Sequence, residues 1–157
     1  MSNRGLAQII PESVSAVTAT PSIELGTEKW VGGNKYTYVY NASTSTAAVN
    51  YGVVYSAMSG YSVTVSSVAM YDRAAGLVVN NDIGVHEYGW VMTKGFGPCK
   101  ADTTTVPGLR VYLGDDGVWS NNGTDGTDTG WTGIFAGVAV GDNADATGTF
   151  TAFLNCG

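Results

Sequence analysis

The sequence predicts an all-β protein: a compact single-domain β-sandwich or barrel of short antiparallel strands with an extended N-terminal arm. Composition argues against long helices, because the 157 residues include 22 glycines and only 13% are charged, and glycine interrupts helices while good helix formers such as Lys, Glu and Arg are scarce. Patterning favours strands, because short alternating or β-branched segments recur with turn sequences between them, as in sandwiches and barrels. The length suits one domain.

The N-terminal residues 1–33 are predicted to form the arm, and residues 34–157 the β-domain. The arm contains Pro11 and Pro21 and has no sustained period, although one short strand could fit in it. It has too little apolar surface to fold alone, so we expect it to order against its own domain or a neighbouring subunit. The candidate partner-binding residues are seven of its apolar side chains: Leu6, Ile9, Ile10, Val14, Val17, Ile23 and Trp30.

The first part of the β-domain contains four longer predicted strands and one short one. The first follows a Gly-Gly-Asn turn and is rich in tyrosine and β-branched residues, which favour strands. The third alternates between apolar and polar residues, as expected of a half-buried strand. The four longer strands are residues 35–40, 51–55, 61–66 and 84–94. Residues 67–75 are the best helical candidate, with a poor stripe and no cap, and residues 78–79 are a short strand before a turn.

The second part of the domain is predicted to hold three more strands. Residues 109–113 alternate and end at a Gly-Asp-Asp-Gly turn, a tight-turn sequence. Residues 134–140 and 147–154 follow, and residues 141–145 are expected to join them as a hairpin loop. Residues 121–130 form a polar, glycine-rich stretch that we expect to be an exposed loop.

The residues available for catalysis are few, and the sequence does not predict an enzyme or a cofactor. His86 is the only histidine, so any Ser-His-Asp or Cys-His arrangement would have to use it. His86 and Glu87 are neighbours in a predicted strand, and their side chains would therefore point to opposite faces. A structural or surface role for His86 is favoured.

Metal sites are also not predicted. Three Cys and His residues without short spacing do not make a zinc site. Calcium could use the loop aspartates, but none has an EF-hand spacing, and turn formation explains them better. Those residues are Asp115, Asp116, Asp125, Asp128, Asp142 and Asp145. Cys99 and Cys156 could form one bridge or remain two thiols; since no export signal is apparent, thiols are the default, and the pairing stays open.

Charge and apolar runs limit the partners. The net charge of −6, with only 7 basic residues, disfavours nucleic acid. No apolar run reaches the ~18 residues of a membrane span. The tryptophans could stack on a sugar, with the last two flanking the polar loop, but core and interface packing is the stronger interpretation. They are Trp30, Trp90, Trp119 and Trp131.

Four segments, taken in order, resemble small phage virion proteins that coat or cement icosahedral heads. Each motif is short, and their order and spacing across residues 34–157 carry the resemblance. The segments are KYTYVYN at 35–41, EYGWVMTKG at 87–95, FAGVAVG at 135–141 and TGTFTAFL at 147–154. The loop at 121–130 and the N-terminal arm depart from the pattern.

The resemblance implies a capsid decoration or cement protein with a β-tulip-like domain. Such a protein would be a homotrimer on the outer capsid surface, seated on the major capsid protein at three-fold and quasi-three-fold positions. It would stabilise the shell against the pressure of the packaged DNA without catalysis, and would be assembled into the virion in the host cytoplasm. The alternative is a tail or fibre component, or a virion protein that binds host-surface carbohydrate.

Overall fold

Strands make up nearly all the regular structure of the computed structural model, which describes residues 12–56, 60–65, 73–102, 105–120, 134–141 and 148–156. In chain order they are β1 (Glu28–Val31), β2 (Asn34–Asn41), β3 (Gly52–Tyr55), β4 (Ser62–Thr64), β5 (Ala74–Leu77), β6 (Tyr88–Lys100), β7 (Arg110–Leu113), β8 (Trp119–Ser120), β9 (Ile134–Ala139) and β10 (Thr149–Asn155). Within those ranges the only helical element is a 3-10 turn, η2 (Asp115–Gly117). None of the described segments is a helix that could cross a membrane.

Five strands close into a small barrel. Their order is β2-β4-β3-β5-β6, and β2 also pairs with β6, which completes the ring. Each strand places one small apolar side chain in the buried barrel interior: Val39, Val53, Val63, Ala75 and Val91. The predicted all-β, barrel-type class is confirmed. One pairing departs from the antiparallel expectation, since β4 runs parallel to β2; the chain reverses direction twice between these strands.

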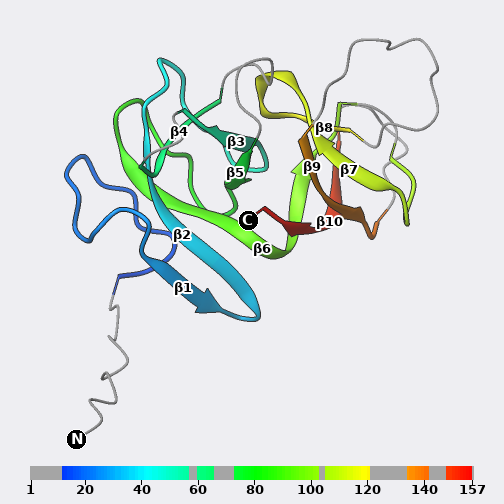
Figure 1. Cartoon of the computed structure of the whole chain (residues 1–157), viewed down its shortest axis with the longest axis horizontal. Coiled ribbons are helices and arrows are strands. Elements are labelled where there is room, and N and C mark those ends of the chain that lie inside the picture. Colours follow the sequence, from blue (N-terminus) through cyan, green and yellow to red (C-terminus); the bar gives the residue numbers. More distant parts are fainter. Residues whose placement is uncertain are drawn as a thin grey trace, which may run out of the picture.

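The strand order continues beyond the barrel because β6 is long enough to belong to both parts. The C-terminal half of β6 pairs with β10, and the order continues through β9 and β7 to β8; this part is here called the second sheet. Figure 1 shows the barrel strands on the left and this second sheet on the right. Buried side chains of both parts form one core cluster, including Leu77 and Met92 from the barrel and Leu113, Trp119 and Leu154 from the second sheet. The two parts therefore share one core.

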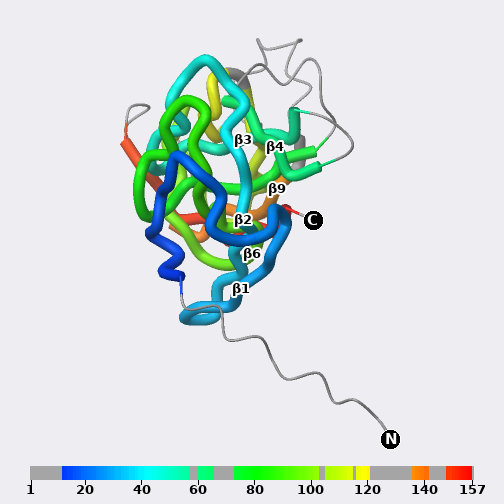
Figure 2. The backbone as a smooth tube through the Cα atoms, turned by 90° about the vertical axis from the view of Figure 1, so that its left-hand side faces the viewer, coloured from blue at the N-terminus to red at the C-terminus, as the bar shows by residue number. Residues whose placement is uncertain are grey.

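The described part of the N-terminal segment, residues 12–33, lies against the barrel. Thr18 and Tyr88 exchange two backbone hydrogen bonds of 2.9 and 2.8 Å, and the Tyr38 hydroxyl lies 3.1 Å from Thr18 Oγ1. Val14 and Ile23 pack against the shared core. Figure 2 shows the segment passing over β2 and β6. Of the two supports expected for the arm, its own domain therefore orders this part.

The strand predictions were wrong in two places. Strand β5 lies at Ala74–Leu77, where the sequence suggested the end of a helix followed by a strand at 78–79; residues 67–72 lie outside the described ranges. All four β5 residues are buried, so the segment lacks the alternation that would have identified it. Strand β6 begins at Tyr88, not at residue 84, and continues to Lys100.

Candidate interaction surfaces

The predicted partner-binding residues fall into three groups. Leu6, Ile9 and Ile10 lie outside the described residues. Val14, Val17 and Ile23 are half-buried against the chain's own core clusters. Trp30 is 61% exposed. Of the described candidates, Trp30 is therefore the one whose side chain is largely open to a partner, and partner binding by this set stays a prediction.

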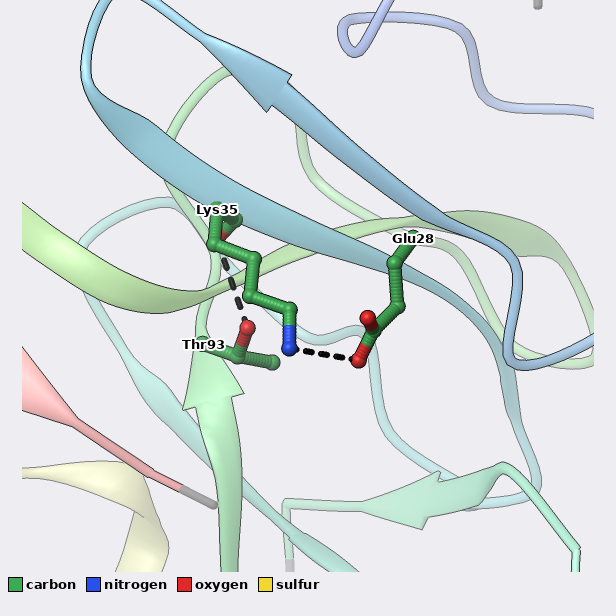
Figure 3. Close-up of polar contacts among 3 residues, drawn as sticks. All are labelled: Glu28, Lys35 and Thr93. Atoms are coloured by element: carbon green, nitrogen blue, oxygen red, sulfur yellow. Dashed lines mark hydrogen bonds and ion pairs between the residues drawn. The ribbon is translucent and has the colours of Figure 1, made fainter. Parts of the chain in front are cut away.

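Trp30 lies near the tip of the β1–β2 hairpin, where β1 forms one edge of the sheet. Trp30 is opposite Lys35 in the strand register. Lys35 Nζ lies 2.6 Å from Glu28 Oε1, and the Thr93 hydroxyl donates a 3.4 Å hydrogen bond to the Lys35 carbonyl oxygen; Figure 3 shows both contacts. Because the ion pair is partly exposed, it is expected to contribute less than about 1 kcal/mol.

A second exposed surface is the outward side of β6, β10, β9 and β7, here called the outer face. Phe153 is opposite both Phe96 and Val138 in the register, and the two phenylalanine rings lie 5.0 Å apart between centroids. Phe96 is 57% exposed and Val140, just beyond β9, is 51% exposed. An apolar row therefore crosses three adjacent strands on the outside of the sheet.

The outer face is basic at its borders. Arg110 is opposite Val138 and Lys94 is opposite Asn155, and both charged residues are exposed. The four strands that form this face contain no Asp or Glu, although the chain as a whole has a net charge of −6. The strands of this face therefore contribute basic side chains and no acidic ones.

His86 is part of a turn before β6, contrary to the strand predicted over 84–94. It has a positive φ of 60°, which is uncommon for a residue with a side chain. Its Nδ1 lies 3.0 Å from the Tyr40 hydroxyl. Glu87 Oε2 instead accepts a 2.9 Å hydrogen bond from the backbone N–H of Gly84. His86 therefore contacts the side chain of Tyr40, and Glu87 supports the backbone at Gly84.

The aspartates considered for calcium do not assemble into a site among the described residues. Asp116 is exposed in the turn η2 with φ of 56°. Asp125, Asp128, Asp142 and Asp145 lie outside the described ranges. Within the described part of the chain, no group of three His, Cys, Asp or Glu side chains is arranged to hold a metal ion.

The tryptophans considered for sugar stacking are divided between core and surface. Trp90 and Trp119 are buried in the shared core, so they cannot stack on an external sugar; this corrects the idea that Trp119 would be accessible beside the polar loop. Their indole nitrogens have no hydrogen-bond partner among the residues that the structure describes. Trp30 remains exposed, and Trp131 lies outside the described ranges.

The two cysteines are buried free thiols. The Cys99 Sγ lies 3.8 Å from the carbonyl oxygen of Gly97. Burial away from water raises the pKa of Cys99, and the same cause raises the pKa of Cys156 to about 12. A thiolate is the reactive form of cysteine, so this environment suits packing rather than nucleophilic chemistry.

No protein-family model and no curated protein matches the chain. Among solved structures, the chain is similar to the head fiber gp8.5 N base of bacteriophage phi29, with a TM-score of 0.51 and 16% sequence identity over 76% of this chain and 94% of that one. At this identity the likeness shows a shared fold. Fold alone does not define function.

Proposed function

We propose that the chain is a structural protein of a bacteriophage virion, carried on the head, and that it is not an enzyme. The observation that carries the proposal is the fold likeness to the head fiber base of phage phi29. This is an argument by analogy of fold. It is supported independently by the order of the four sequence motifs, which resembles that of head-coating phage proteins.

The specific role we propose is decoration or cement. In this role the chain sits on the major capsid protein at three-fold and quasi-three-fold positions of the outer head surface, as a homotrimer that stabilises the shell. Exposed apolar side chains on the β1–β2 hairpin and the outer face support this role, since contiguous apolar surface commonly marks a protein contact.

A second candidate is the base of a head fibre, favoured by the similar phi29 protein. A decoration protein and a fibre base can both sit on the shell, and they differ in whether a shaft projects from the bound domain. Carbohydrate binding is a further alternative, for which Trp30 is the exposed tryptophan among the described residues; a Trp30→Ala variant on a glycan array tests it.

The test is the composition and structure of purified particles. We expect the chain in a fixed ratio to the major shell protein, measured by quantitative mass spectrometry, and density at symmetry-related head positions in electron cryomicroscopy. Low knobs would identify decoration, whereas a projecting shaft would identify a fibre base. Absence of the chain from mature heads would contradict the proposal in both forms.

A further inference from the structure

We propose that the chain binds the phage head through the outer face of the second sheet, and that this face contacts an apolar protein patch bordered by carboxylates. This inference rests on the proposed function and assigns the surface and the chemistry of its partner. It concerns a different surface from the N-terminal residues predicted as partner-binding.

The first support is geometric. Phe96, Phe153 and Val138 are aligned by the strand register across β6, β10 and β9. They stand on the side of the sheet away from the core, because their neighbours Gly97, Ala152 and Ala139 are buried. Regular strands on a shared core hold this row in place, so binding would require little ordering of the chain.

The second support is charge. Lys94 and Arg110 border the apolar row and are exposed, and Lys100 at the end of β6 is half-buried. Of these residues, Lys94 carries the argument, because β6 and the neighbouring β10 contain no acidic residue. A partner surface with carboxylates around apolar side chains would match both features, and complementary charge would also guide its approach.

A two-fold contact with a second copy fits less well; the contacts within a homotrimer are of another kind, because they join two different patches. A two-fold contact through the outer face would bring the same patch together from both copies. It would place the Lys94 and Arg110 side chains of one copy against the same basic surface of the other. Like charges facing each other at an interface are unfavourable, so we assign the face to a partner of opposite charge.

The experiment measures binding to heads purified from phage that lack the gene for this chain. The full chain is added, heads are sedimented, and the bound fraction is measured at several salt concentrations. We expect wild-type binding that weakens with salt, since exposed charges are screened. Val138→Ser should weaken binding about tenfold or more, as for a central interface residue. Lys94→Glu, at the border, should weaken binding and reduce its dependence on salt. Phe96→Ser is a second variant in which a polar side chain replaces an apolar one on this face.

Matched controls lie elsewhere on the molecule. Arg73→Glu makes the same change in charge as Lys94→Glu, at an exposed residue over the Tyr55 ring. Val85→Ser makes the same change as Val138→Ser, at a side chain of similar exposure, 40% against 37%. Both controls should bind as the wild type does. Thermal melts followed by circular dichroism establish that every variant compared is folded.

Several results would overturn the inference. If the outer-face variants bind heads as the wild type does, or if the control variants lose as much binding as the outer-face variants, the outer face is not the head-binding surface. The proposed binding of the chain to heads would still stand. Wild-type chain that does not bind heads would instead overturn the proposed function, and this inference with it. Self-association abolished by Val138→Ser but not by Val85→Ser would assign the face to a second copy. DNA binding abolished by Lys94→Glu would assign it to nucleic acid.

Discussion

Asn41 is a fully buried polar residue at the end of β2. Its Nδ2 group donates to the carbonyl oxygens of Ser45, Ile83 and Gly84 at 2.9, 3.0 and 3.1 Å, and its Oδ1 accepts from the Ser43 N–H at 3.0 Å. One side chain thus satisfies backbone groups of two loops at the rim of the barrel. Buried backbone groups that lose such partners are costly.

We expect Asn41→Ala to lower the free energy of unfolding by about 3 kcal/mol, because several backbone groups would lose their partner in a buried place. Urea denaturation measures the change. Asn34→Ala is the control: Asn34 also bonds to backbone, that of Phe96, but in an exposed setting, and about 1 kcal/mol is expected there. Equal losses of unfolding free energy in the two variants would show that the buried hydrogen bonds of Asn41 stabilise the fold no more than the exposed ones of Asn34.

The buried thiols predict a loss of stability at alkaline pH. In the unfolded chain a thiol releases its proton near pH 8.5, whereas burial raises the folded-state pKa of Cys156 to about 12 and raises that of Cys99 as well. Between these values the unfolded chain holds fewer protons than the folded one, so stability is fully present below about pH 8.5 and falls as pH rises.

The measurement is chemical denaturation between neutral and alkaline pH for the wild type and for a Cys99→Ala, Cys156→Ala double variant. The wild type should lose more stability on the alkaline side than the variant does. Native thiols should also react slowly with an alkylating agent and rapidly in denaturant. Fast labelling of the native chain would contradict the burial on which this prediction depends.

At the scale of elements, strand β6 connects the two halves of the fold. Its first half pairs with β2 and closes the barrel, and its second half pairs with β10. Trp119 of β8 and Leu113 of β7 then reach back to the barrel, where they pack directly over Gly52 at the start of β3. The absence of a side chain at Gly52 lets the second sheet approach the barrel closely.

We expect Gly52→Ala to destabilise the fold by about 1–3 kcal/mol, the usual range for overpacking a core. A methyl group at this position would lie 2.6 Å from Cζ2 of Trp119, so the ring or the strand must move. Thermal melting measures the effect. Gly141→Ala is the matched control, because the nearest atom to its added methyl, the Thr151 backbone nitrogen, is 3.5 Å away, and little change is expected.

At the scale of the whole molecule, the N-terminal segment belongs to the folded domain from residue 12 onward. Val14, Ile23 and Leu25 pack against the cluster that contains Tyr38 and Trp90. Removing the segment would bare that apolar surface. A chain lacking residues 1–25 would therefore lose stability, because Val14, Ile23 and Leu25 would no longer pack against the core.

Deletion of residues 1–25 should lower the melting temperature, because buried apolar area is lost. Deletion of residues 1–11 removes none of the described contacts and is expected to leave the melting temperature close to that of the full chain. Differential scanning calorimetry of the three chains measures both effects. Equal melting temperatures would contradict the stabilising role of residues 12–25.

Sequence reasoning located the strands whose pattern is local. Strands β2, β7, β9 and β10 lie close to their predicted positions, because alternation, β-branched residues and flanking turns identify a half-buried strand. Strand β5 was missed because all its residues are buried and it has no alternation. Strand β6 continues as one strand through several glycines and a proline. Its full length was not predicted, because these residues usually indicate turns.

The sequence by itself determined the all-β class and the scarcity of catalytic groups, since both follow from composition and from short-range pattern. Only the tertiary structure decided that Trp119 is buried and that Phe96, Val138 and Phe153 lie side by side. Phe96 is far from Val138 and Phe153 in the chain, and the contact of all three depends on the strand order β6-β10-β9. Strand order results from long-range pairing and core packing, for which one sequence carries no local signal.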